Sequence, residues 1–410
     1  MRTAAVIVVS GGGVSPFTRL GGLSLLQRAV LTAQKAGAAT CYLVLAQDQE
    51  ALQHELQNDP RVTSQVAWVR LNPGAMVAIE QESFCLVFAV DTIFRYPLVQ
   101  ELSRQAAPGK SVTVADAAGV PLLALTDGSR VSEMCAELAQ GKSLPETTVL
   151  ASSDKIQTGS ARGHFLRHLT AGSNLARVEH DLLLSLENPR DGQVDTYCNR
   201  KLSRLITPWL LRTPLSPNHI TVLSCLIGMF GALCFLPGGY WGPVLGALLL
   251  QFSVVLDCCD GEVARVKFME SPLGDWLDNV CDTVVYIAIF LGMGVAVWRN
   301  GAAGHALALA VILALGGSLA FRLVTLAEKT EETGNRRSGW EDMLVKKLLA
   351  SLTTRDFTVL IVASALTGQL GWFLWGAAIG AHVFWLSLAW LLFRAGRFEW
   401  RRRVREREEI

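Results

Sequence analysis

The sequence predicts two domains of different class: an α/β domain over residues 1–190 and an all-α domain with six membrane-spanning helices over residues 216–400. Three observations support this division. Short β-rich runs alternate with helix-like stretches in the first part. Long apolar segments dominate the second part of a chain that is 50% hydrophobic overall. Two pairs of aspartates stand at the ends of two of these apolar segments.

The first 190 residues carry the pattern of a mostly parallel sheet, because strand-like runs are separated by helix-like stretches. Six strands are predicted, at Thr3–Ser10, Cys41–Ala46, Thr63–Leu71, Phe84–Val90, Ser111–Ala115 and Pro121–Leu125. Two helices are predicted, at Leu23–Ala36 and Gln49–Gln57. The first strand leads into Gly11, Gly12 and Gly13, a loop whose backbone N–H groups could approach a phosphate. A tight turn between strand and helix explains the same glycines equally well.

Residues 191–215 are predicted to form a linker and an interfacial helix. Cys198–Arg212 mixes apolar residues with Arg200, Lys201 and Arg204, as does an amphipathic helix that lies on an anionic lipid leaflet. An ordinary helix that links two domains is the alternative.

Serine followed by proline predicts where two membrane helices begin, because serine caps a helix and proline suits its first position. Ser216–Pro217 opens the first span and Ser271–Pro272 the third. Residues 357–393 carry no charge and are too long for one crossing, so we expect a turn near Gly368–Trp375. The expected spans are Asn218–Leu236, Tyr240 to about Arg265, Pro272 onward, Asn300–Phe321 and two within 357–393.

The basic residues predict the orientation. They concentrate on the side that carries the N-terminal domain, and the opposite turns hold only Arg299. We therefore expect a multi-pass protein of the cell inner membrane, with the N-terminal domain, the aspartates and the tail at 401–410 on the cytoplasmic side. A formal net charge of +1 excludes a bulk nucleic-acid-binding character. Nine scattered cysteines without paired spacing give no reason to expect disulfides.

The aspartates predict a cation site. Asp257 and Asp260 share one helical face, as do Asp278 and Asp282 on the next helix. An acid within a membrane helix costs roughly 2.5–3.5 kcal/mol, so four unpaired ones would cost on the order of 10 kcal/mol. Divalent cations held by oxygen ligands would offset that cost. An interhelical polar network without a ligand is the alternative.

The same stretch reads D-x2-D-G-x2-A-R-x8-G-x3-D-x3-D, which resembles the signature of the CDP-alcohol phosphotransferases (CDP-alcohol phosphatidyltransferases). The resemblance extends over about residues 195–400 and implies transfer of a phosphoalcohol with release of CMP. It implies Asp257, Asp260, Asp278 and Asp282 as ligands of two Mg²⁺ ions, with Mn²⁺ as a substitute, and Asp282 as the general base. It implies a CDP site made of Asp257, Asp260, Gly261, Ala264, Arg265, Gly274 and Asp278, together with Asn218 and Thr221 of the PNHIT stretch.

Two arginines are candidates for binding the phosphate of an acceptor, because the guanidinium group binds phosphate through two parallel hydrogen bonds. They are Arg322, near the inner end of the fourth span, and Arg355, which opens the fifth. Anchoring by the positive-inside rule explains either residue equally well.

The N-terminal domain resembles the sugar-phosphate nucleotidyltransferases in the order of its elements. The glycine loop is followed by a segment like that family's second helix (Gly21–Ala38), and VFAVDTIF looks like its strand ending in a metal-binding aspartate, here Asp91. The loop departs from the family's pattern, since it lacks the usual Pro-Lys pair and the first lysine is Lys35, within a helix. Cytidylyltransferase activity is therefore left open. A domain that only binds nucleotide, or that braces the membrane half, is the alternative.

The fusion of the two domains resembles bifunctional inositol-phosphate cytidylyltransferase/di-inositol-phosphate-phosphate synthases. This resemblance favours CDP-inositol as donor and inositol phosphate as acceptor. The alternatives are a phospholipid synthase that uses CDP-diacylglycerol and a polar alcohol and, more remotely, a cation transporter. Membrane lipids are expected partners, and the small residues in Gly304–Gly317 leave a homodimer open.

Overall fold

The computed structural model describes twelve segments of the chain, which fall into two compact units. The segments are 3–9, 14–45, 49–57, 59–70, 84–105, 111–116, 120–140, 148–152, 165–186, 195–301, 304–332 and 357–394. The first unit comprises Met1–Pro189 together with Leu211–Pro214 and Arg265–Met269. The second comprises Arg190–Leu210, Leu215–Ala264 and Glu270–Ile410.

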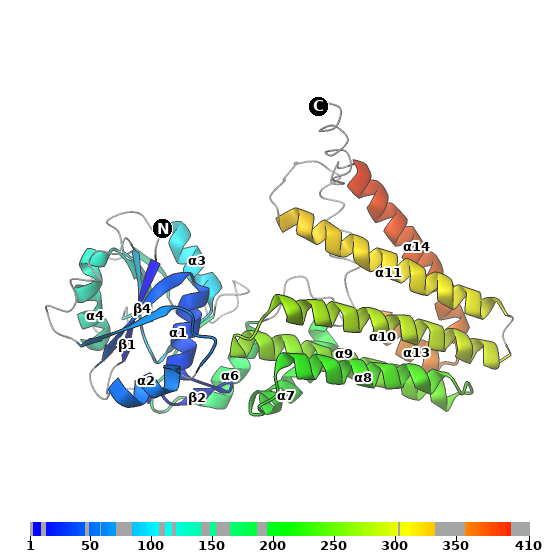
Figure 1. Ribbon diagram of the computed structural model, residues 1–410, viewed down its shortest axis with the longest axis horizontal. Coiled ribbons are helices and arrows are strands. Elements are labelled where there is room, and N and C mark those ends of the chain that lie inside the picture. The colour runs from blue at the N-terminus through cyan, green and yellow to red at the C-terminus, as the bar shows by residue number, and fades with distance from the viewer. Residues whose placement is uncertain are drawn as a thin grey trace. The chain divides into compact units, whose positions relative to one another are not determined.

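A seven-stranded sheet forms the centre of the first unit (Figure 1). Its strand order is β10-β8-β9-β6-β1-β4-β5. The bounds are β1 Thr3–Val9, β4 Ala38–Leu45, β5 Gln65–Arg70, β6 Phe84–Ala89, β8 Val112–Ala115, β9 Pro121–Thr126 and β10 Thr148–Ser152. Strand β9 runs antiparallel to both β6 and β8, whereas the other neighbours pair in parallel. The predicted α/β sheet is thus confirmed, with one strand reversed.

Both faces of the sheet are covered, which explains why its central strand is a continuous apolar run. Helix α4 (Val131–Gln140) packs on one face through Val131, Met134 and Cys135. Helix α1 (Leu25–Lys35) lies on the opposite side (Figure 1). The unit also contains α2 Gln49–Gln57, α3 Tyr96–Gln105, α6 Leu175–Leu184 and the short strands β2 Arg19–Leu20, β3 Leu23–Ser24, β7 Thr92–Phe94 and β11 Leu166–His168.

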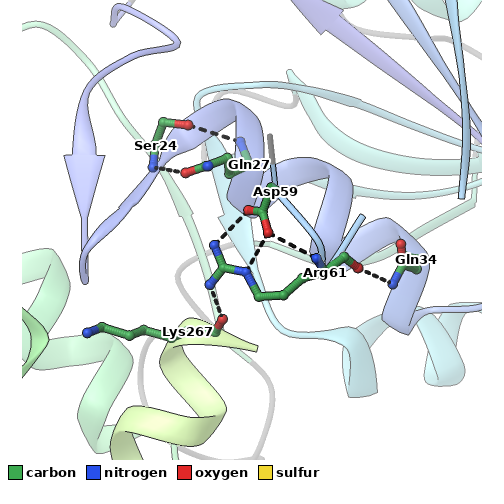
Figure 2. Close-up of polar contacts among 6 residues, drawn as sticks. All are labelled: Ser24, Gln27, Gln34, Asp59, Arg61 and Lys267. Atoms are coloured by element: carbon green, nitrogen blue, oxygen red, sulfur yellow. Dashed lines mark hydrogen bonds and ion pairs between the residues drawn. The ribbon is translucent and has the colours of Figure 1, made fainter. Parts of the chain in front are cut away.

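Helix α1 begins at a capping box, which fixes how the chain turns from β3 into the helix. The Ser24 hydroxyl accepts from the Gln27 backbone N–H at 3.2 Å, and the Gln27 side-chain oxygen accepts from the Ser24 N–H at 3.1 Å (Figure 2). Two groups at the helix N-terminus are satisfied reciprocally in this way.

The second unit is helical, and five of its described helices are long and apolar enough to cross a membrane. These are α8 Pro217–Phe235, α9 Trp241–Lys267, α10 Pro272–Arg299, α11 His305–Glu332 and α14 Leu370–Arg394. Helix α13 (Phe357–Leu366) has ten residues, about 15 Å at 1.5 Å per residue, which is short of a bilayer core. Among the described residues the candidate spans therefore number five, and the sixth predicted crossing stays a prediction.

Small residues bring α8, α9 and α10 close together. A Cβ added at Gly231 on α8 would lie 3.0 Å from the Gly246 carbonyl oxygen on α9. A Cβ added at Gly292 on α10 would lie 2.8 Å from the Ala232 carbonyl oxygen on α8. Backbones that approach this closely leave no room for larger side chains. The two acid-bearing helices, α9 and α10, are both packed against α8 by these contacts.

Candidate metal and nucleotide site

Three carboxylates converge from α9 and α10. One oxygen from each of Asp257, Asp278 and Asp282 lies within 4.8 Å of the other two. Asp257 is buried, and the other two residues are partly buried. Two unit charges at 4.8 Å repel by about 3.5 kcal/mol at an effective dielectric constant of about 20. Three ionised carboxylates would therefore need positive charge among them to remain this close.

One atom of the cluster points to a ligand. Asp278 Oδ1 is buried, and among the residues that the structure describes no donor reaches it. A buried acceptor without a partner costs about 1–3 kcal/mol, more when it is charged. Carboxylate oxygens in this arrangement fit Mg²⁺ or a similar hard divalent cation.

Asp260, the fourth acid of the signature, lies outside this group of three and is held by α8. Its Oδ2 accepts a hydrogen bond of 2.5 Å from the Thr221 hydroxyl, and both side chains are buried. The Thr221 hydroxyl also lies 3.1 Å from the Pro217 carbonyl oxygen. The sequence singled out Thr221 only as a nucleotide-binding candidate, and the structure shows in addition that it orients an acid.

The N-terminal ends of α8 and α10 approach each other beside the acids. Ser216 caps α8, with His219 completing a capping box, and Ser271 caps α10. A Cβ added at Gly274 would lie 3.2 Å from the Asn218 side-chain oxygen. Asn218 and Gly274, both predicted to bind the nucleotide, are thus neighbours.

Glu262, which was not predicted from the sequence as a site residue, is a buried acid at a variable position within the signature. It is 1% exposed and accepts from the Ser203 hydroxyl at 2.8 Å and the Thr207 hydroxyl at 2.6 Å. Arg200 Nη1 lies 3.3 Å from Glu262 Oε1, the same oxygen that accepts from Ser203. All three partners come from α7 (Arg200–Leu211), at helical positions i, i+3 and i+7. That polar spacing was the available signal in the sequence.

The opposite face of α7 is apolar and exposed. Leu205 is 70% exposed and Trp209 71%, with Leu202 beside them at 47%. The helix therefore turns its polar face to α9 and leaves its apolar face uncovered among the described residues. This arrangement fits the predicted interfacial helix, which stays a prediction.

The structure places the remaining predicted residues as follows. Gly261 and Ala264 lie on α9 and are partly buried, and Arg265 belongs to the first unit. Arg322 is exposed on α11. Arg355 and the glycine loop Gly11–Gly13 lie outside the described residues.

Asp91, the predicted metal ligand of the N-terminal domain, follows β6 and is buried. Burial raises its pKa, and the neighbouring His168 opposes that rise. His168 Nδ1 lies 3.5 Å from Asp91 Oδ1, so the described partner of this acid is a histidine of β11.

Comparison with known proteins relates the helical unit to one family. Residues 214–393 match the sequence profile of the CDP-alcohol phosphatidyltransferases, so this part of the chain is a CDP-alcohol phosphatidyltransferase domain.

Two curated relatives match parts of the chain. A bifunctional IPC transferase and DIPP synthase of Aquifex aeolicus is 35% identical over 140 residues, which cover 34% of this chain and 32% of the relative. A phosphatidylinositol phosphate synthase of Streptomyces avermitilis is 33% identical over 113 residues, 26% of this chain and 44% of the relative. The chain thus spans less than half of the length of these relatives.

Similarity to solved structures is at a low level. A putative glucose-1-phosphate thymidylyltransferase from Bacillus anthracis is 13% identical with a TM-score of 0.32, and the match covers 45% of this chain and 96% of that one.

Proposed function

We propose that this protein is an integral membrane transferase that moves a phosphoalcohol from a CDP-alcohol to an acceptor hydroxyl and releases CMP. The observation that carries the proposal is the convergence of Asp257, Asp278 and Asp282 within 4.8 Å, with one buried oxygen that no donor of the described residues reaches. The family of residues 214–393 supports the same reaction class.

In this proposal two divalent ions, Mg²⁺ or Mn²⁺, are held by Asp257, Asp260 and Asp278, with Asp282 sharing one of them. When bound, such ions polarise phosphoryl oxygens and offset charge on a leaving nucleotide. The Thr221 hydroxyl keeps the Asp260 carboxylate turned toward α8, which fixes the direction of its second oxygen.

Asp282 is the proposed general base. It takes the proton of the acceptor hydroxyl as that oxygen bonds to the phosphorus bearing the donor alcohol, and the bond from phosphorus to CMP breaks. Arg265 would neutralise phosphate charge, and Gly261, Ala264 and Gly274 would leave space for the nucleotide. Asn218 beside Gly274 would contact it as well.

For the substrates we propose CDP-inositol as donor and inositol phosphate as acceptor, because the chain is similar to a bifunctional IPC transferase and DIPP synthase. The second candidate is CDP-diacylglycerol with a polar alcohol or alcohol phosphate, since a phosphatidylinositol phosphate synthase is similar over 113 residues. Arg322 and Arg355 remain the proposed ligands of an acceptor phosphate. The cation-transporter alternative lacks support, because the described acids gather at one end of α9 and α10 rather than along a path.

We propose that the five apolar helices lie in the cell inner membrane with the acids and the N-terminal domain on the cytoplasmic side, as the basic residues predict. The exposed Leu205 and Trp209 face of α7 would then rest on the lipid leaflet. The N-terminal domain is proposed to be nucleotidyltransferase-like, with Asp91 as its metal ligand and Gly11–Gly13 at a phosphate. A homodimer is a further proposal.

The test is product analysis by mass spectrometry. The purified full chain is mixed with Mg²⁺, CDP-inositol or CDP-diacylglycerol, and inositol, inositol phosphate or glycerol phosphate. We expect CMP and a di-inositol phosphodiester from CDP-inositol with inositol phosphate, and neither product without Mg²⁺. Product formed with CDP-diacylglycerol as donor, and none with CDP-inositol, would select the second candidate. No CMP from either donor would contradict the proposed function.

A further inference from the structure

The connection between the two acid-bearing helices is short and has an unusual backbone. Helix α9 ends at Lys267 and α10 begins at Pro272, so four residues join them. Phe268 has φ of 54°, the left-handed conformation that favours glycine and is strained for a bulky residue. Such a conformation persists only where the surroundings hold it.

Residues 265–269 belong to the first unit, and other residues of that unit hold this conformation. Arg61 Nη1 donates a 2.7 Å hydrogen bond to the Lys267 carbonyl oxygen, which is one of the last carbonyls of α9 (Figure 2). The last four carbonyls of a helix have no partner within the helix, and a cation there also suits the helix dipole. Arg28 lies over the Phe268 ring, 5.8 Å from its centre. One arginine thus caps the helix and another covers the strained residue.

Arg61 is itself fixed on both sides. Its guanidinium donates to both oxygens of Asp59, at 2.7 and 2.6 Å, in the two-pronged geometry that gives strong ion pairs (Figure 2). The backbone carbonyl oxygen of Arg61 accepts a hydrogen bond from Gln34 Nε2 on α1 at 3.0 Å. Asp59 is 6% exposed, so the acid of this pair is buried, while the Arg61 side chain is 25% exposed. These contacts hold the Arg61 guanidinium in the position from which it donates to the Lys267 carbonyl oxygen.

The turn between β2 and β3 packs against the same segment. Gly21 and Gly22 both have positive φ, and a Cβ at Gly21 would lie 2.5 Å from Val266 Cγ1. At Gly22 a Cβ would lie 2.6 Å from the Leu211 carbonyl oxygen. Lys267 Nζ donates to the Thr213 carbonyl oxygen at 3.0 Å. Glycines are needed here for both conformation and space.

We infer that Arg61 is a positioning residue for the proposed transferase, which fixes the end of α9 and the turn into α10. This inference rests on the proposed function. Arg265 stands two residues before the clamped carbonyl, and Asp260 stands seven residues before it, about 10 Å along a helix. The turn sets how α10, with Asp278 and Asp282, follows α9. Releasing the turn would therefore shift the acids that must act together.

The test compares Arg61→Ala with Arg104→Ala in the full chain. Arg104 is a matched control, because it pairs with Glu101 at 3.2 Å on the surface of the same unit and its side chain is 76% exposed. CMP release is measured with whichever CDP-alcohol is turned over. We expect Arg61→Ala to lower kcat by at least about tenfold with KM within about threefold, because a misplacement of about 1 Å can cost up to about 100-fold. Arg104→Ala should match the wild type.

Hydrogen exchange gives a readout that does not depend on turnover. We expect faster exchange in a peptide covering residues 265–271 of Arg61→Ala, and unchanged exchange there in Arg104→Ala. A kcat within about twofold of wild type, or unchanged exchange at 265–271, would overturn the inference. If no CDP-alcohol is turned over by the wild type, the proposed function fails, and the exchange experiment still decides whether Arg61 clamps the turn.

Discussion

Asp59 in the first unit and Asp278 in the second are both acids with buried carboxylate atoms, but their carboxylate oxygens have different neighbours. Both oxygens of Asp59 accept hydrogen bonds from Arg61. Asp278 Oδ1 has no donor among the described residues and faces two other carboxylates. A satisfied buried acid holds a structure together, whereas an unsatisfied one in a cluster marks a place for a ligand.

Glu262 sharpens this comparison, because it lies only two residues from Asp260. Its oxygens accept from two hydroxyls and lie beside an arginine, so it belongs with Asp59 rather than with the cluster. Two acids only two positions apart in the chain thus have different partners, and the partners of each carboxylate distinguish them.

The largest expected effect is on turnover. Asp282→Asn keeps the shape of the side chain but removes the base, so we expect CMP release to fall by at least about 100-fold while CDP-alcohol still binds. Asp275→Asn is the control, since Asp275 is an exposed acid in the first turn of the same helix. The measurements are steady-state CMP release and equilibrium binding of the donor. A wild-type rate in Asp282→Asn would remove this residue from the role.

The next effect is on stability. Glu262→Ala leaves Arg200 and two hydroxyls without their acceptor, and breaking a buried pair costs about 3–5 kcal/mol. We expect a clearly lower midpoint of thermal unfolding in detergent. Glu262→Gln keeps an acceptor, so its midpoint should lie between those of wild type and Glu262→Ala. Glu133 is an exposed acid, so Glu133→Ala should change the midpoint little. Equal midpoints for Glu262→Ala and wild type would show that this acid is not structural.

A smaller effect is expected at Thr221. Thr221→Val keeps the shape but removes the donor to Asp260, and a hydrogen bond to a charged group contributes about 1.5–3 kcal/mol. We expect kcat to fall by about tenfold or more, and Thr221→Ser to retain most of the activity. If the valine variant turns over like wild type, the orientation of Asp260 does not depend on this hydroxyl.

The smallest effect is a pH dependence at Asp59. Burial opposes ionisation of this carboxyl, but the hydrogen bonds and charge of Arg61 outweigh it and hold its pKa below the usual value. The stability that the ionised form contributes is present above the unfolded pKa of about 3.9 and is lost as pH falls through the lower folded pKa. Chemical unfolding should show the advantage of wild type over Asp59→Asn shrinking below about pH 4. A difference that stays constant or grows on acidification would contradict this assignment.

The sequence predicted the local features and missed the distant ones. Strands such as β1 and β6 follow from apolar runs, and the helices that carry the acids follow from their spacing. The reversal of β9 depends on which strands pair, and the run Pro121–Leu125 carries no signal for that. The bond from Thr221 to Asp260, the burial of Glu262 and the contact of Arg61 with Lys267 join residues 39, 59 and 206 positions apart. Only tertiary packing creates them.

The central claim is that the acids of α9 and α10 hold divalent ions, and anomalous diffraction from crystals grown with Mn²⁺ tests it most directly. The account predicts an anomalous peak that lies about 2 Å from carboxylate oxygens of Asp257 and Asp278, a distance typical of bound ions of this kind. The peak should be lost in Asp278→Asn crystals. Well-ordered carboxylates with no anomalous density between them at saturating Mn²⁺ would contradict the account.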